Sequence, residues 1–270
     1  MFYKSVWKKF LSLERRAFLL AELEQIERKG RHVPSVLRRL AKRSPSAAED
    51  WINFLRVIDP AESVQLIDVG ANCGEWCQAF LATFPNTKVI AIEPAANTFR
   101  ALETRFSGDP RVRAVRAGAS ERPGSAQLLL ADDSTLNSFV EYEAEFSADR
   151  STVVKEREKV SLVRIDDVVE IDEKASRRVL KLDVQGHEIS ALKGAAATLS
   201  HIDVALCELS FVNEYVGVSP SFSEATELLR AAGLYPVVFQ EYGTSMTNHR
   251  LECDVLYVRA ALFKEFYDPR

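Results

Sequence analysis

The chain has 270 residues, of which 47% are hydrophobic and 27% are charged, values typical of a globular protein and inconsistent with extensive disorder. Residues 1–50 hold 12 Lys and Arg against 6 Asp and Glu, whereas the remainder holds 23 against 33. A body with a net charge of −10 argues against nucleic-acid binding.

Residues 1–60 are expected to form a helical extension, separate from a domain over residues 61–270. Apolar residues recur at helical spacing in residues 1–30, and shorter helices are predicted over residues 34–42 and 47–57. Within residues 1–30, basic residues are interleaved with aromatic ones. That composition fits either contact with an anionic membrane surface or a helix packed on the body or in a dimer.

The four cysteines, Cys73, Cys77, Cys207 and Cys253, match neither zinc nor thioredoxin spacing. Nothing in their arrangement suggests a disulfide framework, which fits a reducing compartment. No apolar run reaches the ~18–20 residues that a membrane-spanning helix needs. The N-terminus lacks the apolar core and cleavage site of a signal peptide. The expected location is therefore the cytoplasm.

Strands and helices alternate from residue 64 onward. The predicted strands are residues 64–69, 88–92, 112–117, 126–130, 160–165, 179–182, 204–206, 235–239 and 254–258. The predicted helices are residues 75–83, 97–106, 165–169, 188–199 and 223–232. Residues 131–158 are polar, show little periodicity and are expected to form a loop or insertion.

Alternation of this kind predicts a parallel sheet with helices on both faces. The last two strands are joined only by a polar loop, so they are expected to form an antiparallel hairpin at one edge. The predicted fold is α/β: a Rossmann-like, doubly wound, mostly parallel seven-stranded sheet with an antiparallel edge hairpin, plus the N-terminal helical extension.

The first strand leads into a glycine-bracketed turn, Gly70-Ala71-Asn72-Cys73-Gly74, that precedes a helix. Glycines in such a turn let the backbone approach a nucleotide-type ligand closely. Asp68, near the end of the strand, is expected to order the turn by accepting backbone N–H bonds. Glu93 ends the second strand, 23 residues after Gly70, where a carboxylate can accept both hydroxyls of a ribose. Alternatively, Glu93 only caps the next helix.

In a doubly wound sheet, ligands bind beyond the carboxyl ends of the strands. The third strand is followed by Gly118-Ala119-Ser120, small residues beside which an adenine could lie. Asp183 and Gln185-Gly186-His187-Glu188 follow the strand at residues 179–182, and Glu208 ends the next one. Taken alone, His187 reads as a helix-start residue hydrogen-bonded to the backbone. Its place beside Asp183 makes it a candidate site residue.

Four stretches together resemble the FkbM-type S-adenosylmethionine-dependent methyltransferases, over about residues 64–259. They are residues 68–74, 92–94, 180–195 and 207–209. The stretch at residues 180–195 is the most specific, whereas the glycine loop is shared by class I methyltransferases at large. Gln185 departs from the family, which often has Glu there, and so removes a negative charge from this position.

The resemblance implies O-methylation of a hydroxyl on a sugar, a glycan or a glycosylated or polyketide-like product, with S-adenosylmethionine as the methyl donor. The cofactor site that it implies consists of Asp68, Gly70, Ala71, Asn72, Gly74, Glu93, Pro94, Ala119 and Asp183. Within this set, Glu93 would hold the ribose, and Asp183 would lie next to the methyl group. A small-molecule or glycan acceptor is the expected partner, and no nucleic acid is expected.

An alcohol is a poor nucleophile at neutral pH, so a base within hydrogen-bonding reach of the acceptor would help the transfer. His187 is the expected base, with Asp183 orienting it or supporting it electrostatically. Alternatively, Asp183, Glu188 and Glu208 could hold a divalent metal that acidifies a diol. No metal is expected, because no ligand spacing in the chain is diagnostic.

Two other functions remain open at this stage. An NAD(P)-dependent oxidoreductase also needs a glycine loop and an acid after the second strand, but it predicts a G-x-G-x-x-G loop and a Tyr-x-x-x-Lys pair, which this chain lacks. A non-catalytic scaffold protein with the methyltransferase fold could attach to a glycan-synthesis complex through residues 1–60. A scaffold protein that has lost catalysis has no need to retain Glu93, Asp183 and His187. The presence of these residues therefore argues against the scaffold alternative.

Overall fold

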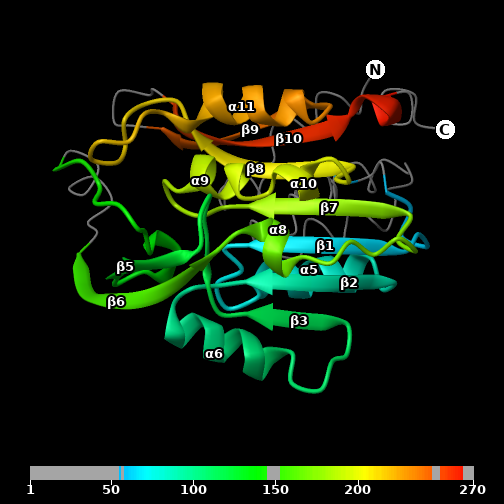
Figure 1. Cartoon of the computed structure of the whole chain (residues 1–270), viewed down its shortest axis with the longest axis horizontal. Helices are drawn as coiled ribbons and strands as arrows, with labels where there is room; N and C mark the ends of the chain where they lie inside the picture. The colour runs from blue at the N-terminus through cyan, green and yellow to red at the C-terminus, as the bar shows by residue number, and fades with distance from the viewer. Residues whose placement is uncertain (1–54, 56–57, 145–152, 245–249, 264–270) are drawn as a thin grey trace, which may run out of the picture. The chain divides into compact units, whose positions relative to one another are not determined.

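The computed structural model describes residues 55, 58–144, 153–244 and 250–263 (Figure 1). The chain divides into two units, Met1–Asn53 and Phe54–Arg270, and every element below belongs to the second. Apart from Leu55, the helices expected before residue 58 lie outside the described residues. Membrane contact or dimerisation through residues 1–30 therefore stays a prediction.

Seven strands in the described residues form the main sheet, in the order β3-β2-β1-β7-β8-β10-β9 (Figure 1). Their bounds are Val64–Val69 (β1), Thr87–Ile92 (β2), Val112–Val115 (β3), Arg177–Leu182 (β7), Val204–Ser210 (β8), Leu234–Thr244 (β9) and Arg250–Arg259 (β10). β1, β2, β3, β7 and β8 run parallel, whereas β10 runs antiparallel to β8 and to β9. The predicted mostly parallel sheet with an antiparallel edge hairpin is confirmed.

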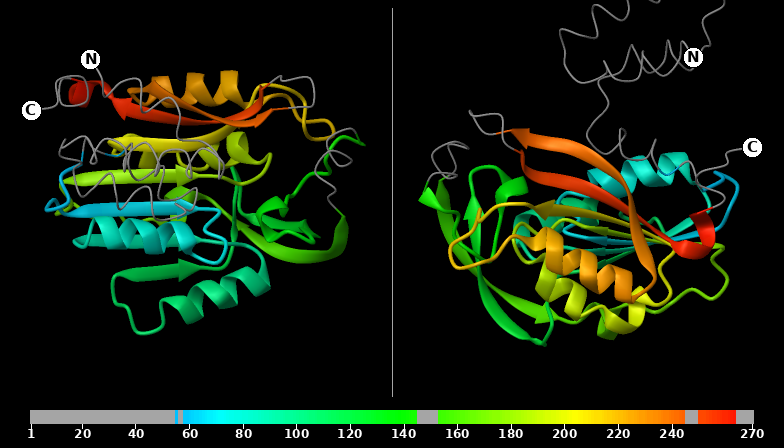
Figure 2. Two further views of the ribbon diagram at one scale, coloured as in Figure 1. Left: turned by 180° about the vertical axis from the view of Figure 1, so that it is seen from behind. Right: turned by 90° about the horizontal axis from the view of Figure 1, so that it is seen from above.

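Helices cover both faces of this sheet. They are α5 (Glu75–Thr83), α6 (Ala96–Arg105), α8 (Ile165–Val168), α9 (Glu188–Lys193), α10 (Ala196–Leu199) and α11 (Ser221–Ala231). Figure 2 shows α5 (cyan) on one face and α9 to α11 (yellow to orange) on the other. All six residues of β1 are buried, because a parallel strand between two helical layers has no solvent-facing side. In the described part of the chain, none of the helices has the length and apolarity to cross a membrane.

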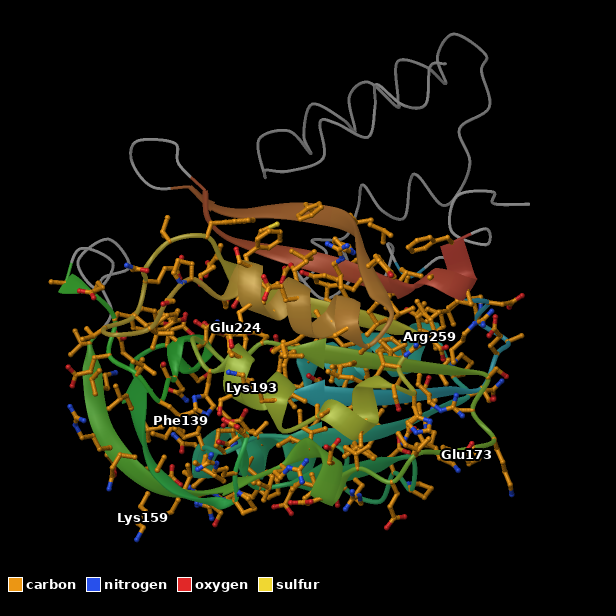
Figure 3. All side chains as sticks on the ribbon, turned by 45° about the horizontal axis from the view of Figure 1, so that its top comes forward. Phe139, Lys159, Glu173, Lys193, Glu224 and Arg259 are labelled. Carbon is orange, nitrogen blue, oxygen red and sulfur yellow. The ribbon has the colours of Figure 1, made fainter. Side chains whose placement is uncertain are left out.

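Polar contacts of Lys193 and Arg259 add to the apolar packing of the α9–α11 layer. Lys193, at the end of α9, and Glu224, in the first turn of α11, form an ion pair of 2.7 Å (Figure 3). Arg259, at the end of β10, donates hydrogen bonds to three backbone carbonyls, those of Leu199, Ile202 and Ala232. Its guanidinium thus satisfies carbonyls at the ends of α10 and α11 that helical bonding leaves free.

A second sheet lies beyond the carboxyl ends of the parallel strands (Figure 1). It consists of β4 (Gly118–Ala119), β6 (Val154–Val163) and β5 (Gly124–Ala131), in that spatial order. The expectation of a loop over residues 131–158 is therefore wrong from Val154 onward, and a 3-10 helix, η1 (Ser134–Leu136), interrupts it earlier. β6 is exposed along most of its length. Its strand character rests on backbone pairing with β5 and not on apolar alternation.

Several strand and helix boundaries differ from the expected ones, and two of these differences lie close to Ser120. β3 ends at Val115 instead of residue 117, and Gly118 begins β4 in the second sheet. The helix expected over residues 188–199 is divided into α9 and α10 at Gly194. A Cβ atom at Gly194 would lie 2.0 Å from the carbonyl oxygen of Ser120. The backbone of Ser120 therefore occupies the space that a side chain of a continuous helix would need.

Candidate active site

The carboxyl ends of four parallel strands bring the expected site residues to one edge of the main sheet. The register pairs Val69 with both Ile92 and Leu182, and Leu182 with Cys207. Because these four residues are level with one another, the residues that follow them are level too. Those followers are Gly70, Glu93, Asp183 and Glu208.

Gly70 begins the glycine loop, at the place where β1 meets β7. Its φ is +79°, and a Cβ atom there would lie 1.7 Å from the carbonyl oxygen of Asp183, so only glycine fits. The N–H groups of Gly70 and Ala71 both donate to the carbonyl of Ile92, at 3.0 and 3.1 Å. These bonds fix the loop to the end of β2.

The far half of the loop rests on α6 and η1. A Cβ atom at Gly74 would approach the side chains of Leu102 and Phe106 to 2.6 and 2.7 Å. Asn72 has a φ of 48°, in the left-handed region, and its side-chain amide donates to the hydroxyl of Ser134 at 3.2 Å. The loop therefore has a fixed shape, while Asn72 stays partly exposed.

Glu93 is 5% exposed, and its carboxylate joins the glycine loop to α6. Oε2 accepts the N–H of Asn72 at 2.9 Å, while Oε1 accepts the N–H of Ala95 at 3.0 Å and the hydroxyl of Thr98 at 2.7 Å. Burial raises the pKa of Glu93 in spite of these bonds. The bonds at α6 match the helix-capping alternative. Each carboxylate oxygen offers about two acceptor positions. Within the described chain, Oε2 accepts only the N–H of Asn72, so one of its positions stays free.

Pro94 and Ala119 complete the predicted cofactor set. Pro94 directly follows Glu93 and is partly exposed. Ala119, in β4, is 2% exposed and packs in the main hydrophobic core. Its side chain therefore offers little surface to a ligand, and the adjacent Ser120 lies within hydrogen-bonding distance of the Ser190 hydroxyl, at 3.1 Å.

Lys181 is a buried charged residue that the sequence analysis did not single out. Its Nζ donates to the carbonyl oxygen of Gly70 at 2.8 Å and lies 3.3 Å from Asp183 Oδ2 and 3.5 Å from Asp68 Oδ1. Burial opposes the charge, but the carboxylates of Asp183 and Asp68 outweigh it and raise the pKa of Lys181. A signal was present in the sequence, because a lysine between Leu180 and Leu182 in a buried part of a central strand needs acidic partners.

Asp68 is linked to the glycine loop through Lys181. It is fully buried, and it accepts the thiol of Cys77 at 2.9 Å in addition to facing Lys181. In the described structure no backbone N–H donates to its carboxylate, so the expected bonds to the loop backbone are replaced by Lys181, which bonds the carbonyl of Gly70.

Asp183 is the accessible acid of the site. Its side chain is 36% exposed, with Oδ2 facing Lys181 and Oδ1 accepting an N–H from Gln185 at 3.0 Å. Burial opposes ionisation, but the ammonium of Lys181 outweighs it and lowers the pKa of Asp183. An ionised carboxylate therefore stands next to Gly70.

Glu208 and two tyrosines surround Gln185. Gln185 Nε2 donates to Glu208 Oε2 at 2.6 Å, and its Oε1 accepts the hydroxyls of Tyr142 at 2.8 Å and Tyr215 at 3.2 Å. The two tyrosine rings pack with centroids 4.7 Å apart. Burial and the carboxylate of Asp183 raise the pKa of Glu208, so Glu208 favours its neutral form, unlike Asp183.

His187 directly precedes α9, and its ring packs on Phe139 with centroids 5.0 Å apart. Burial lowers the pKa of His187, which favours the neutral imidazole. In the described structure its Nε2 is buried without a hydrogen-bond partner, and no hydrogen bond joins it to Asp183. The side-chain contacts of Asp183 go to Lys181, Gln185 and Glu208 instead, so the expected orientation of His187 by Asp183 is not present in this arrangement.

Glu188 holds the turn that precedes α9. It is 4% exposed, and its Oε1 accepts the N–H of Gly186 at 3.0 Å. Burial raises the pKa of Glu188 to about 7. Among the described residues, no group of three His, Cys, Asp or Glu side chains is arranged to hold a metal ion.

The Glu188→Gln variant should show the cost of this burial as a pH dependence. Folding raises the pKa of Glu188 from 4.5 to about 7, so the native state binds the extra proton and wild-type stability falls as pH rises between these values. Relative to Glu188→Gln, the wild-type free energy of unfolding should fall by about 3 kcal/mol over that window. Urea unfolding at a series of pH values measures this. Glu227→Gln, on the exposed side of α11, is the matched control, and a constant difference for Glu188→Gln would contradict the prediction.

The comparison with protein families identifies the family of the chain. The methyltransferase FkbM domain matches residues 68–234. The chain belongs to the FkbM methyltransferase family. Its cofactor is therefore S-adenosylmethionine, and the family match argues against the oxidoreductase alternative. None of the curated proteins matches the chain.

Solved methyltransferases resemble this FkbM protein only distantly. The FkbM methyltransferase of Methylobacillus flagellatus KT is 18% identical with a TM-score of 0.48, over 74% of this chain and 44% of that one. This chain thus spans less than half the length of that relative. A precorrin-6y C5,15-methyltransferase from Geobacter metallireducens is 12% identical, covering 81% of this chain and 92% of that one, with a TM-score of 0.42. A SAM-dependent methyltransferase from Aquifex aeolicus is 14% identical, covering 84% and 98%, with a TM-score of 0.42.

The charges and the free acceptor position of the site fit S-adenosylmethionine. Two carboxylates, Asp68 and Asp183, face the single ammonium of Lys181, which leaves a net negative charge beside the loop and suits a sulfonium cation. Glu93 Oε2 keeps an acceptor position for a ribose hydroxyl. These residues would hold the donor against the Gly70–Gly74 loop.

Replacing Glu93 with Gln should weaken donor binding. The amide of Gln cannot accept on both sides, so it loses a bond either to the Asn72 N–H or at the start of α6 and leaves a buried donor unsatisfied. A loss of ~1.5–3 kcal/mol corresponds to a Kd for S-adenosylhomocysteine about 10–100-fold higher, measurable by calorimetry. Glu103→Gln, exposed on the same helix, is the control. If Glu93→Gln bound S-adenosylhomocysteine as tightly as wild type, the assignment of Glu93 to the donor site would be wrong.

Proposed function

We propose that this methyltransferase acts on a hydroxyl group of a sugar, a glycan or a glycosylated or polyketide-like product. The observation that carries the proposal is the state of Asp183, an ionised and accessible carboxylate next to the loop assigned to the donor. A neutral hydroxyl needs such a group, since it must lose a proton during transfer. The sugar-like class of acceptor rests on the resemblance described above.

S-adenosylmethionine, when bound, supplies a methyl group activated on a sulfonium. Asp183 is placed to accept a hydrogen bond from the acceptor hydroxyl and to align its oxygen. During the transfer, Asp183 would take the proton of the acceptor hydroxyl. Lys181 keeps Asp183 ionised until that moment.

His187 is a second group able to take the proton. Its lowered pKa keeps it neutral, and its Nε2 has no partner within the described structure. Replacing it with Ala or Gln separates the two bases. If a His187 variant keeps the wild-type rate, Asp183 alone takes the proton of the acceptor hydroxyl.

The test uses S-adenosylmethionine labelled in the methyl group and a panel of methyl glycosides, with a glycan extract as a broader source of acceptors. We expect label in a product that survives mild alkali, as a methyl ether does and a methyl ester does not. Label that is lost in alkali would contradict O-methylation of a hydroxyl. Binding of S-adenosylhomocysteine without transfer to any acceptor would favour the non-catalytic scaffold.

A further inference from the structure

The side chain of Gln185 uses every hydrogen-bonding position that an amide has. Its two N–H donors go to the carboxyls of Asp183 and Glu208, at 3.0 and 2.6 Å. Its oxygen accepts the hydroxyls of Tyr142 and Tyr215, at 2.8 and 3.2 Å. An amide offers two donors and two lone pairs, so the bonding is complete, and Gln185 is only 9% exposed.

The backbone of Gln185 is held as firmly as its side chain. Its φ is +50°, a left-handed conformation that costs a non-glycine residue about 1–2 kcal/mol. Its carbonyl oxygen accepts the hydroxyl of Ser138 at 2.6 Å. A Cβ atom at the next residue, Gly186, would lie 2.8 Å from the ring of Tyr215. Strain of this kind persists only where the surroundings impose it, as they do at functional sites.

The four partners of Gln185 come from the two sides of the site. Asp183 directly follows β7, and Glu208 lies in the adjacent strand β8. Tyr142 lies in the segment after η1, and Tyr215 lies between β8 and α11. Both tyrosines belong to loops at the carboxyl edge, the kind of segment that commonly carries binding residues. The amide is thus the link between the accessible acid and the acceptor-side loops.

No other common side chain can make the same set of bonds. A glutamate in this place has no N–H donors and would add a third carboxyl to Asp183 and Glu208, which like charges disfavour. A leucine would fill the volume but leave two carboxyls and two hydroxyls without their partner. The pattern of partners therefore requires an amide.

We infer that Gln185 is a positioning residue for methyl transfer, whose amide holds the Asp183 carboxylate in place by joining it to Glu208 and to the Tyr142–Tyr215 pair. The inference rests on the proposed function in one respect, that Asp183 receives the proton of the acceptor hydroxyl. Gln185 itself exchanges no proton. It acts through Asp183.

A first experiment tests the bridge without any acceptor. Proton–nitrogen NMR of the full chain gives the side-chain amide signals, and Gln185 is assigned by the signal that disappears in Gln185→Glu. We expect its amide protons to exchange with water at least about tenfold more slowly than those of Gln127, which is exposed on β5. We also expect Glu208→Ala to shift them. Exchange as fast as that of Gln127, or no shift in Glu208→Ala, would overturn the inference.

A second experiment tests the effect on the reaction, with the methyl glycoside that wild type labels best. Gln185→Glu should lower kcat by about 10²-fold or more and move the acid limb of the kcat/KM profile to higher pH, because the added carboxyl and the lost donors both raise the pKa of Asp183. Gln185→Leu should move the limb less. Ser138→Ala, which removes a bond to the backbone of the same residue, should leave it in place. Every variant keeps the other charged groups around Asp183 and Glu208, which are Lys181, Asp68, Glu188, Glu252 and Asp254.

An acid limb that stays at the wild-type pH in Gln185→Glu would overturn the positioning role, even if methyl transfer to a hydroxyl is found. Binding of S-adenosylhomocysteine within about threefold of wild type is expected in all variants and separates this role from damage to the donor site. If wild type labels neither the methyl glycosides nor the glycan extract, the proposed acceptor class fails. The NMR result then decides the amide bridge independently.

Discussion

The Asp183→Asn enzyme is expected to lose ~10²–10⁴ of its methyl-transfer rate, the range that removal of a general base produces. Asn keeps the shape of the side chain but cannot take a proton from the acceptor. It also removes the charge that faces Lys181 at 3.3 Å, although Lys181 keeps its bond to Gly70 and its contact with Asp68. The measurement is kcat with saturating donor and acceptor. The Kd for S-adenosylhomocysteine should change far less than kcat.

Asp167→Asn is the control for this variant. Asp167 lies in α8, its side chain is 50% exposed, and its contact is a 3.8 Å ion pair with Arg164. The substitution makes the same chemical change away from the strand ends and should leave kcat unchanged. Equal rates for wild type and Asp183→Asn would contradict the role of Asp183. A joint loss of rate and donor binding would assign Asp183 to the donor instead.

Gly70→Ala should be the most destabilising single substitution in the glycine loop, at about 3–5 kcal/mol, the range of exceptional point mutants. The new Cβ would lie 1.7 Å from the carbonyl oxygen of Asp183. The two strand ends must then separate, and this also breaks the 2.8 Å bond from Lys181 to the carbonyl of residue 70. Urea unfolding gives the loss of stability, and calorimetry should find no donor binding.

Gly108→Ala separates the conformational cost from the steric one. Gly108 has a φ of +80°, almost the same as that of Gly70, but a Cβ atom there would meet nothing within 4 Å. Its cost should be only the ~1–2 kcal/mol of a left-handed alanine. If Gly70→Ala and Gly108→Ala lost similar amounts of stability, the close approach to the Asp183 carbonyl would not be the reason that position 70 requires glycine.

The sequence predicts the main sheet well because its signals are local. Buried apolar strands alternate with amphipathic helices, and the glycines of residues 70 and 74 stand where the chain must turn closely. The edge hairpin followed from two strands with no helix between them. The site at the carboxyl edge then follows from the rule for parallel sheets, and the register of β1 with β2 and β7 places Glu93 and Asp183 level with Gly70.

The contacts that give these residues their chemistry were not predictable in the same way. The bonds of Gln185 join residues 43 and 30 positions away, Tyr142 and Tyr215. No local pattern reveals such pairs, because they depend on how loops cross the ends of the strands. The first part of β6, from Val154 to residue 159, was missed for a related reason. Its charged and exposed side chains carry no alternation, and only its pairing with β5 makes it a strand.

The central claim is transfer of a methyl group to a hydroxyl whose proton Asp183 takes. It is tested most directly by following a trideuterated methyl group from S-adenosylmethionine into the product. Mass spectrometry gives the rate, and carbon NMR gives the atom that carries the label. The account predicts a trideuteromethyl group on oxygen in wild type and a rate lower by ~10²–10⁴ in Asp183→Asn. Label on nitrogen or carbon, or an Asp183→Asn enzyme as fast as wild type, would contradict it.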